Sequence, residues 1–420
     1  MKASICIVTT GQPSTNPRAV KEADALAAAG HAVRLIGAQW ADWADEADEK
    51  LLAGRAWHGE VLRWKRADAP ARFWWTRGRH RAARAAIGWP ALGRALLPAA
   101  TSRITPELTT LARRRRADLF IAHNLGALPA AAAAAARWGA CLGFDAEDLH
   151  SGQFAAADRS AAWRATCQAE RTWIPQCDYV TAAAPGIAAA YAPFSRRPPT
   201  LIRNVFPLAD RPARAPGGST DGRLRLYWFS QTIGPNRGLE EVVRAMGRLP
   251  DGTVELHLRG AWWDRFEDTL AGVARTAGLE RTRIVWHSPS DPGEMVRLAA
   301  AWDIGLVTET GETNNSNLAQ SNKAYTYLLA GVPILSSDTA GHVELLAEAP
   351  GAGWTYPRGD WPALAERFAR LAGDRAGRRQ AAARAWSWGE VRFNWDVEAQ
   401  KLVAEVNRVL GDRQRASVAS

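Results

Sequence analysis

Two basic residues stand where helices are predicted to begin, and both could bind a phosphorylated ligand. In YWFSQTIGPNRGLEEVVRAM, Arg237 follows a glycine-containing turn and comes just before a helix. In SNKAYTYLLAGVPILSSD, Lys323 lies in the first turn of a helix that ends at Gly331. Backbone amides at a helix N-terminus attract anions, and a guanidinium or ammonium group beside them adds to that attraction. A simpler interpretation, in which both are solvated surface cations, stays open.

Lys323 is unfavourable in a first helical turn, because its charge opposes the helix dipole at a cost of roughly a few tenths of a kcal/mol. Ser321 is a good N-cap residue for this helix, and Gly331 supplies a left-handed stop. The lysine is easier to explain if a phosphate occupies the space beyond the helix. Arg237 and Lys323 would then hold a diphosphate from two sides without a metal ion.

Acidic residues and a histidine follow two predicted strands in the other half of the chain. The segment FDAEDLH places Asp145, Glu147 and Asp148 at a strand end, and His123 ends the apolar run in ADLFIAHN. A carboxylate there could accept a proton or stabilise a developing cation. We take Glu147, Asp148 and His123 as candidate catalytic residues. A helix-capping role for the acids and a structural role for the histidine are the alternatives.

Several common sites are missing from the sequence. The histidines form no HxxxH pair and the cysteines no CxxC pair, so we predict no metal site. There is no Walker A loop, no GxGxxG after the first strand and no GxSxG elbow. These absences argue against a P-loop kinase and a serine hydrolase, and they weaken the case for a dinucleotide oxidoreductase. We expect no cofactor.

Two series of short apolar strands, alternating with helices, must position these residues. Strands of the first series are predicted at 4–10, 31–37, 117–124, 139–147, 177–183 and 200–205, with a helix at 17–30. The second series has strands at 224–230, 254–260, 283–289, 303–309 and 332–338, and helices near 239–248, 264–277, 292–301 and 321–330. This alternation predicts parallel sheets covered on both faces. We expect an α/β fold of two doubly wound domains that face a cleft.

A Pro/Gly/Arg-rich segment separates the two series. We expect an N-terminal domain at 1–206, a linker at 207–223 and a C-terminal domain at 224–385. The tail at 386–420 is amphipathic, and we expect it to form a helix that packs back across the N-terminal domain. The length of 420 residues fits such a division, because one core rarely serves so long a chain.

The net charge of +10 is concentrated in one stretch, residues 72–116, which holds eleven arginines and one acid. Trp74, Trp75 and Trp89 lie among the arginines. A basic stretch that bears tryptophans can lie on an anionic membrane surface. Binding of nucleic acid and a composition that simply favours arginine are the alternatives. No helix-turn-helix, zinc-finger or RNA-binding motif supports nucleic acid, so we expect no nucleic-acid partner.

No apolar run approaches the roughly 20 residues that cross a bilayer. The first apolar segment is too short for a secretory signal. We therefore expect a cytoplasmic protein that associates peripherally with the inner face of the membrane.

Four segments, in this order, resemble the nucleotide-sugar glycosyltransferases of the GT-B fold. The resemblance is to the large bacterial, mostly retaining group (glycosyl transferases group 1, family 4-like). FDAEDLH is similar to its YDAHEL segment, and SQTIGPNRGLEEVVRAM to its glycine-rich turn with a basic residue. SNKAYTYLLAGVPILSSDTAGHVELL resembles its NK-hydrophobic-xEYLaaGxPVi element, and NWDVEAQKLV its closing helix. The resemblance spans nearly the whole chain.

The resemblance implies two Rossmann-like domains, of which the C-terminal one binds a nucleotide-sugar donor and the N-terminal one the acceptor, without a divalent metal. It implies that Arg237 and Lys323 hold the donor diphosphate. The other residues assigned to the donor are Ser321, Asn322, Gly234 and Asn236 at the diphosphate, and Thr326 and His287 at the nucleotide or sugar.

Two departures from that group bear on the chemistry. Its members carry two glutamates, eight residues apart, that contact the sugar and the ribose, and Leu318 and Thr326 occupy those positions here. The histidine of the YDAHEL segment is replaced by Glu147. A carboxylate could serve as a general base instead, so the donor sugar and the stereochemical outcome stay open.

Three hypotheses follow. The first is a metal-independent glycosyltransferase that moves a hexosyl or deoxyhexosyl group to a polysaccharide, lipid-linked or natural-product acceptor. Positive charges would stabilise its leaving diphosphate. The second is a sugar-nucleotide epimerase or hydrolase, for which only the Asp145–Asp148 cluster offers acid/base groups. The third is a non-catalytic sugar-nucleotide-binding or scaffold protein, motivated by the missing glutamate pair.

Overall fold

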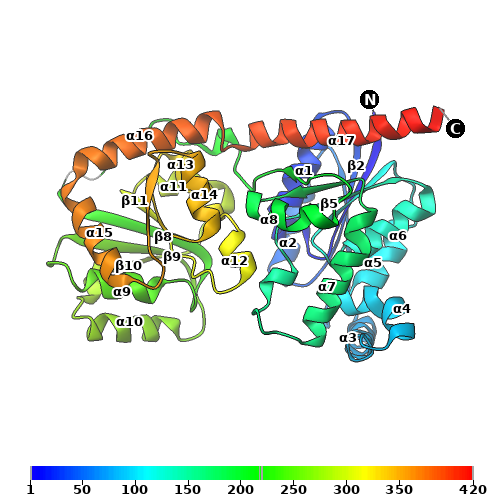
Figure 1. Cartoon of the computed structure of the whole chain (residues 1–420), viewed down its shortest axis with the longest axis horizontal. Helices are drawn as coiled ribbons and strands as arrows, with labels where there is room; N and C mark the ends of the chain where they lie inside the picture. The colour runs from blue at the N-terminus through cyan, green and yellow to red at the C-terminus, as the bar shows by residue number, and fades with distance from the viewer. Residues whose placement is uncertain (1, 217, 219–220, 419–420) are drawn as a thin grey trace. The chain divides into compact units, whose positions relative to one another are not determined.

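The computed structural model describes residues 2–216, 218 and 221–418. The chain divides into two compact units (Figure 1). The N-terminal unit comprises residues 1–202, 313–315 and 399–420, and the C-terminal unit comprises 203–312 and 316–398.

The described part of the N-terminal unit holds a seven-stranded parallel sheet in the order β3-β2-β1-β4-β5-β6-β7. Its strands are β1 (Ser4–Thr9), β2 (Ala32–Ala38), β3 (His58–Leu62), β4 (Leu119–His123), β5 (Cys141–Ala146), β6 (Tyr179–Ala182) and β7 (Thr200–Leu201). Every residue of β4 and β5 is buried, as expected for central strands that helices cover on both faces.

The helices of this unit connect the parallel strands. They are α1 (Pro17–Ala28), α2 (Ala44–Leu52), α3 (Pro70–Ala85), α4 (Pro90–Thr101), α5 (Thr105–Ala112), α6 (Leu128–Trp138), α7 (Ala161–Trp173) and α8 (Pro185–Tyr191). Helix α1 begins at a proline, with Asn16 accepting from Ala19 N–H as its cap. Gly30, with φ of 90°, follows the helix as the predicted left-handed stop.

The C-terminal unit holds, among the residues described, a six-stranded parallel sheet in the order β10-β9-β8-β11-β12-β13. Its strands are β8 (Leu224–Ile233), β9 (Val254–Trp262), β10 (Ile284–His287), β11 (Ile304–Val307), β12 (Ile334–Ser337) and β13 (Gly353–Tyr356). Its helices include α9 (Leu239–Met246), α10 (Phe266–Thr276), α11 (Met295–Ala299), α13 (Asn322–Ala330), α14 (Ala340–Glu348), α15 (Trp361–Gly373) and α16 (Arg375–Val391).

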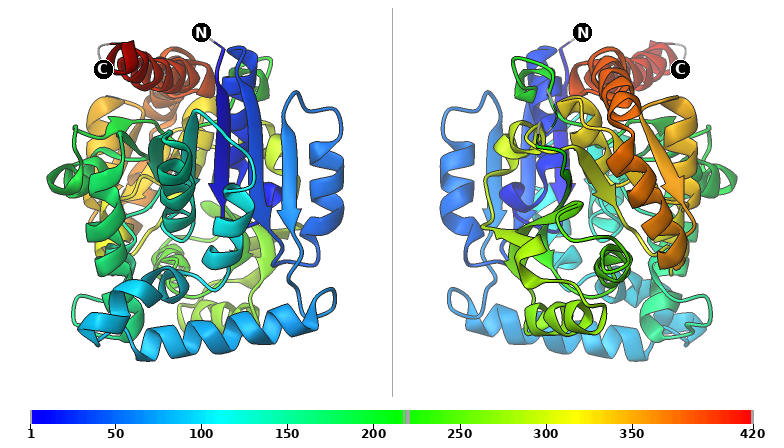
Figure 2. Two further views of the ribbon diagram at one scale, coloured as in Figure 1. Left: turned by 90° about the vertical axis from the view of Figure 1, so that its right-hand side faces the viewer. Right: turned by 90° about the vertical axis from the view of Figure 1, so that its left-hand side faces the viewer.

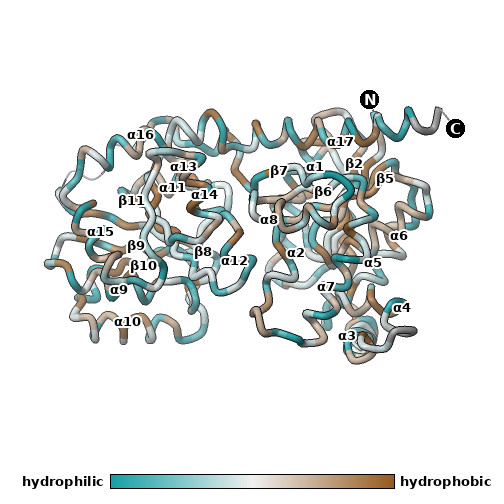
Figure 3. The backbone as a smooth tube through the Cα atoms, viewed as in Figure 1, coloured by the Kyte–Doolittle hydropathy of each residue, from teal (hydrophilic) through white to brown (hydrophobic). Residues whose placement is uncertain are grey.

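Two helices contain residues from both units: α12 (Asn314–Leu318) and α17 (Trp395–Val418). From residue 399 on, α17 belongs to the N-terminal unit. There Asp412 Oδ2 lies 3.4 Å from Arg197 Nη2, and Arg413 Nη1 lies 3.8 Å from Cys141 Sγ. Hydrophilic and hydrophobic residues alternate along α17, which is the amphipathic pattern predicted for the tail (Figure 3).

The predicted α/β fold with two doubly wound parallel sheets is confirmed. The sequence prediction missed β3 and β13, and it made β7 four residues too long. All three strands lie at sheet edges. An edge strand is covered less completely than a central one, so its sequence need not be a continuous apolar run. The segment HGEVL of β3 is half exposed, which explains why its pattern was weak.

The arginine-rich stretch of residues 72–116 comprises most of α3, all of α4 and α5, and the segment after α5. Buried residues of α3, α4 and α7 form a small hydrophobic cluster of their own that includes Ala83, Leu97 and Ala165. Helix α3 is long and straight, and it runs across one end of the N-terminal unit (Figure 2). No helix in the described part of the chain is both long and apolar enough to cross a lipid bilayer.

Candidate functional site

Lys323 is buried at the start of α13 and forms an ion pair with Glu309, which follows β11. Its Nζ lies 2.8 Å from Glu309 Oε1 and 5.2 Å from the centre of the Trp228 ring. The ammonium group lowers the pKa of Glu309 to about 2, so the carboxylate stays charged. Glu309 therefore offsets the cost of a cation beside the positive end of the helix dipole. We had predicted that role for a ligand phosphate.

Side chains from neighbouring elements hold the N-terminus of α13. Ser321 occupies the N-cap position, but it makes no side-chain capping bond, and its hydroxyl lies 3.2 Å from Glu309 Oε1. The Ser321 N–H donates to His342 Nε2 at 3.2 Å, and His342 Nδ1 lies 2.8 Å from Thr339 Oγ1. Burial lowers the pKa of His342 to about 4, which keeps the ring neutral and able to accept.

The backbone N–H groups of Asn322 and Lys323 lie in the first turn of α13, where no preceding helical carbonyl can accept a hydrogen bond from them. Such amides are suited to an anion. The structure therefore places the predicted residues Ser321, Asn322 and Lys323 together at one helix end.

The turn between β8 and α9 has the backbone geometry that its glycine requires. Gly238 has φ of 71°, and a Cβ added there would lie 2.4 Å from the Thr308 carbonyl oxygen. The Thr308 hydroxyl donates to the carbonyl of Arg237, and Asn236 also adopts a left-handed conformation with φ of 60°. Since Thr308 and Glu309 both follow β11, the turn with Arg237 and the Lys323 site lie at the carboxyl ends of neighbouring strands.

Arg237 differs from Lys323 in having no counter-charge at bonding distance. Its side chain makes no hydrogen bond or ion pair with any residue that the structure describes. Its charge nevertheless contributes to the lowered pKa of Glu309, after the larger effect of Lys323. The site thus carries two cations and one carboxylate, an excess of positive charge that favours an anionic ligand.

Gly234 lies beneath an exposed indole. A Cβ added at Gly234 would lie 3.1 Å from the Cβ of Trp263, whose backbone N–H donates to the carbonyl of Ile233 at 2.9 Å. The Trp263 side chain stays 60% exposed, so a flat apolar surface stands beside the turn.

Two further residues assigned to the donor, Thr326 and His287, already make side-chain contacts with other residues of the protein. Thr326 is fully buried, and its hydroxyl donates to the Asn322 carbonyl at 3.1 Å. This leaves no exposed atom for a sugar, which counts against the predicted contact. His287 ends β10, where its Nε2 lies 3.1 Å from His257 Nδ1 and its ring centre 5.3 Å from that of Trp302. Burial lowers the pKa of His287, so the ring is neutral near pH 7.

In the N-terminal unit, Arg18 and Asp145 form a buried, two-pronged ion pair. Arg18 Nε lies 2.6 Å from Asp145 Oδ2 and Nη2 lies 2.7 Å from Oδ1, while the Thr181 hydroxyl donates to Oδ1 at 2.6 Å. Burial alone would raise the pKa of Asp145, but Arg18, His123 and the Thr181 hydrogen bond together outweigh burial and lower it. Asp145 is therefore a charged, fully engaged group that anchors α1 to β5.

His123 belongs to the same network. Its Nε2 lies 2.6 Å from Glu22 Oε2, and its Nδ1 lies 3.3 Å from Asp145 Oδ2, without the geometry of a hydrogen bond. Burial lowers the pKa of His123, but the two carboxylates outweigh it and raise the pKa overall. The carboxylates of Glu22 and Asp145 thus favour a proton on the His123 ring. His123 is only 1% exposed, and these contacts favour the structural alternative over catalysis.

Glu147 and Asp148 follow β5 directly at the carboxyl edge of the sheet, and both are half-buried. Burial raises the pKa of Glu147 above its usual range, as suits a proton-transferring carboxyl group. Asp148 Oδ2 accepts from Gln153 Nε2 at 3.0 Å. Of the three candidate catalytic residues, Glu147 therefore has the properties closest to those of a general acid or base.

No family model matches this sequence, and no curated protein matches it either. Solved structures do match it over almost its whole length. Alr3699/HepE from Anabaena, solved in complex with UDP, gives a TM-score of 0.68 at 17% identity, covering 97% of this chain and 100% of that one. Sucrose-phosphate synthase from Thermosynechococcus elongatus gives 0.70 at 15% identity, with 97% and 99% covered. An α,α-trehalose-phosphate synthase from Burkholderia vietnamiensis gives 0.64 at 15% identity, with 96% and 100% covered. The chain has the GT-B fold.

The predicted residues fall into two groups within the two halves of this GT-B fold. The C-terminal sheet brings Arg237 and Lys323 to adjacent strand ends, with Ser321, Asn322, Gly234 and Asn236 in the same turns. The N-terminal sheet brings His123, Asp145 and Glu147 to the ends of β4 and β5, which are also neighbours.

Sequence reasoning missed three charged residues of these groups: Arg18, Glu22 and Glu309. Arg18 and Glu22 lie four residues apart on the buried face of α1, among Ala19, Ala23 and Leu26. A charged pair on an otherwise apolar face was the available signal, because buried charges need partners. Glu309 directly follows an apolar strand, and a charged residue at such a strand end was the signal that could have identified it as a site residue.

Proposed function

We propose that the protein is a glycosyltransferase that takes its sugar from a nucleoside diphosphate sugar. The observation that carries this proposal is the pair of cations, Arg237 and Lys323, at adjacent strand ends of the C-terminal sheet of a GT-B fold. Alr3699/HepE, which shares this fold, was solved with UDP and with UDP-glucose, which supports a donor of that class.

Departure of the diphosphate is the step that these cations would promote. Negative charge grows on the leaving phosphate oxygens, and fixed positive groups stabilise it more in the transition state than in the ground state. Charge-assisted hydrogen bonds of this kind contribute roughly 1.5–3 kcal/mol each. Glu309 neutralises one positive charge of the site, so Arg237 supplies its uncompensated charge. No metal ion is needed in this scheme.

Glu147 is the group to which we assign proton transfer with the acceptor. A raised pKa brings a carboxyl group closer to neutral pH, where it gives and takes a proton most effectively. We propose a hexosyl or deoxyhexosyl donor and a polysaccharide, lipid-linked or natural-product acceptor.

Thermal unfolding with nucleotides tests the donor site. UDP, GDP, TDP, ADP and CMP would each be added to the wild type, to Arg237→Ala and to Arg244→Ala. Arg244 is exposed on α9, so its loss removes the same charge from outside the turn. A ligand at 100 times its dissociation constant stabilises by about 2.7 kcal/mol. We expect one nucleotide to raise the Tm of the wild type and of Arg244→Ala but not of Arg237→Ala. Equal shifts in both variants would refute the proposal that Arg237 holds the diphosphate.

One observation favours a second candidate, a sugar-nucleotide-binding protein without catalysis. Thr326 is buried and bonded within its own helix, so it does not replace a carboxylate that contacts a sugar. Nucleotide binding without any sugar transfer or nucleotide release would support this candidate.

We further propose that the protein is cytoplasmic and docks on the inner face of a membrane through α3. Trp74 and Trp75 are 53% and 66% exposed on this helix, and Arg77 and Arg81 accompany them. Exposed indoles beside arginines suit the interface of an anionic bilayer.

A further inference from the structure

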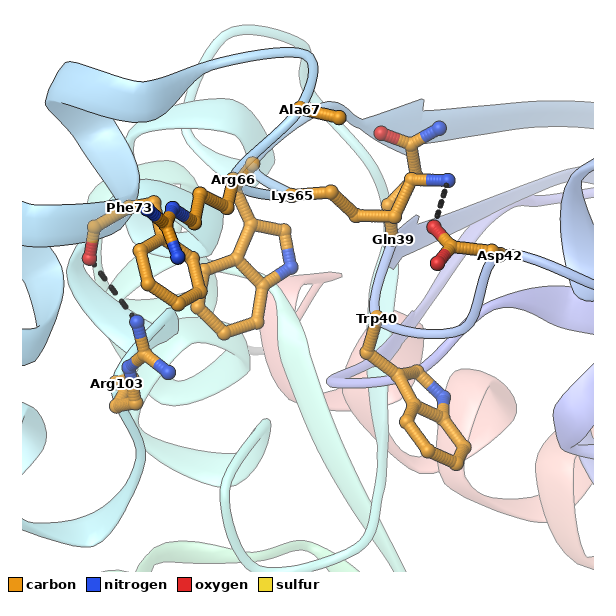
Figure 4. Close-up of a pocket in the computed structure, with 9 residues that line it drawn as sticks. Gln39, Trp40, Asp42, Lys65, Arg66, Ala67, Phe73 and Arg103 are labelled. Atoms are coloured by element: carbon orange, nitrogen blue, oxygen red, sulfur yellow. Dashed lines mark hydrogen bonds and ion pairs between the residues drawn. The ribbon is translucent and has the colours of Figure 1, made fainter.

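A pocket of about 710 Å³ lies in the N-terminal unit, beyond the carboxyl ends of β2 and β3 (Figure 4). Its walls come from the segments that follow these two strands, from the first turn of α3 and from the loop before α5. This volume is in the range of small-ligand sites. None of the residues assigned above to the donor or to proton transfer lines it.

A buried glutamine fixes one wall of this pocket. Gln12 Oε1 accepts from the Trp40 N–H at 3.0 Å, and Gln12 Nε2 donates to Asp45 Oδ1 at 2.9 Å. Asp45 also forms an ion pair with Lys65, whose Nζ lies 2.9 Å from Asp42. The segments after β2 and β3 are therefore tied together, and Lys65 is surrounded by the carboxylates of Asp42, Asp45 and Asp68, so it has no charge to offer a ligand.

Two arginines in the pocket have no such neutralisation. Arg103 lies 4.6 Å from the ring centres of both Trp64 and Phe73 and donates to the Phe73 carbonyl at 3.0 Å. Arg103 Nε and Trp64 Nε1 are buried without a hydrogen-bond partner. Arg66 lies 5.4 Å from the centre of the Trp74 ring. Neither arginine forms an ion pair with a carboxylate in the described part of the chain.

Other arginines near Arg103 add to the positive charge around its guanidinium group. Burial lowers the pKa of Arg103, and the charges of Arg77 and Arg81 lower it further. In contrast, Arg79, which lies on α3 between Arg77 and Arg81, has a carboxylate partner: its Nη2 lies 2.6 Å from Glu107 Oε2. A half-buried guanidinium that faces cations and no carboxylate is a binding group for an anion.

The pocket also presents an indole face. Trp40 is 59% exposed, and its Nε1 donates to Thr15 Oγ1 at 3.2 Å, which fixes the orientation of the ring. Figure 4 shows Trp40 and Arg103 coming from different sides of the pocket. A flat apolar surface with cations beside it fits a ring that carries a negative substituent.

We propose that this pocket binds the glycosyl acceptor as an anionic saccharide. The sugar ring would pack on the indoles of Trp40 and Trp64, and its phosphate or carboxylate would accept hydrogen bonds from Arg66 and Arg103. The inference rests on the proposed function, because it assigns the pocket to the acceptor of that reaction. Binding to the pocket can still be measured without any transfer.

Calorimetric titration of the full-length protein tests the ligand class. The titrants are glucose 6-phosphate, glucuronate, glucose and inorganic phosphate. We expect at least one of the two anionic sugars to bind about tenfold or more tightly than both glucose and inorganic phosphate. The better of the two identifies phosphate or carboxylate as the acidic group. Equal affinity for glucose, binding of inorganic phosphate alone, or no saturable binding of either anionic sugar would overturn the proposal.

Matched variants locate the binding. Arg66→Gln and Arg103→Gln are each expected to weaken the anionic sugar by about tenfold, whereas Arg114→Gln, which removes the same charge from an exposed position before β4, is expected to bind like the wild type. Arg66 is exposed, so its variant stays informative if Arg103→Gln does not fold. Equal affinity in all three variants would overturn the assignment to this pocket. Nucleotide binding, measured in the same samples, reports separately on the donor site, so a failure of one leaves the other distinguishable.

Discussion

Single residues set the charge of the proposed donor site. Lys323 is buried with Glu309 as its partner, whereas Arg237 has no partner among the residues described. A buried lysine without a carboxylate would lose its hydration without compensation, so Glu309 is what allows a cation at the head of α13. Arg237 is the group left with charge to offer a ligand.

This division of roles predicts a specific pattern of stability. Lys323→Met leaves the half-buried Glu309 without its cation, and the loss is expected to be smaller than the roughly 3–5 kcal/mol that breaking a fully buried pair costs. Replacing both partners, as in Lys323→Met with Glu309→Gln, removes the isolated charge and is expected to restore most of that loss. Urea unfolding of the two variants and of Glu309→Gln measures the coupling. Additive losses in the double variant would show that the two groups do not depend on each other.

At the scale of elements, two connections converge on the N-terminus of α13, and a third joins the end of β11 to a neighbouring turn. This N-terminus receives Glu309 from the end of β11 and His342 from α14, and the same strand end binds the turn before α9 through Thr308. The site is therefore held by side chains from separate helices and strands. A change at His342 should therefore shift the backbone N–H groups at the start of α13, which we propose bind the diphosphate, although His342 itself would not touch that ligand.

The pKa of His342 predicts how stability depends on pH. The pKa of this ring is about 4 in the folded protein, whereas an unfolded histidine has its ordinary pKa of 6.5. Between these values the unfolded state holds more protons, so stability rises with pH and falls as the pH drops from 6.5 towards 4. The difference corresponds to roughly 3 kcal/mol at most. Unfolding free energies at several pH values should show that His342→Gln weakens this dependence. An unchanged slope would contradict the role given to His342.

The elements also show what the sequence could and could not predict. Central strands such as β4 and β5 were predictable because burial on both faces makes them continuously apolar. Arg237 and Lys323 were predictable because turn glycines and helix starts are local features of the sequence. Arg18 was not found, because its partner Asp145 comes from a distant element that only the folded sheet order brings close. Glu309 lies only 14 residues before Lys323, but the sequence does not show that the end of β11 meets the start of α13.

For the molecule as a whole, the fold separates the arginine-rich stretch of residues 72–116 into two places. Phe73 of α3 and Arg103 line the pocket beyond the carboxyl ends of β2 and β3. Arg113–Arg116 are exposed just before β4, at the opposite, amino-terminal edge of the same parallel sheet. One flat membrane cannot contact both edges at once, so we assign membrane docking to α3 alone.

Vesicle binding tests this assignment. Arg77→Ser with Arg81→Ser removes two charges from α3, and each basic residue near an anionic surface contributes about 1 kcal/mol. Partitioning onto vesicles that contain phosphatidylglycerol should fall by roughly tenfold or more, and added salt should weaken it in the wild type. The matched control, Arg114→Ser with Arg115→Ser, removes the same charge from the other edge and should partition like the wild type. A larger loss in the control would place docking at that edge.

Sugar transfer itself is the most direct test of the central claim. Full-length protein would be incubated with the diphosphate sugar of whichever nucleotide raises its Tm, together with glucose 6-phosphate or glucuronate, and the products would be identified by mass spectrometry. We predict a glycosylated acceptor and an equal amount of released nucleoside diphosphate. Arg237→Ala should lower the rate by about tenfold to a hundredfold, and Arg244→Ala should leave it unchanged. Tight nucleotide binding with neither transfer nor release of the diphosphate would contradict the account and identify a protein that binds sugar nucleotides without turning them over.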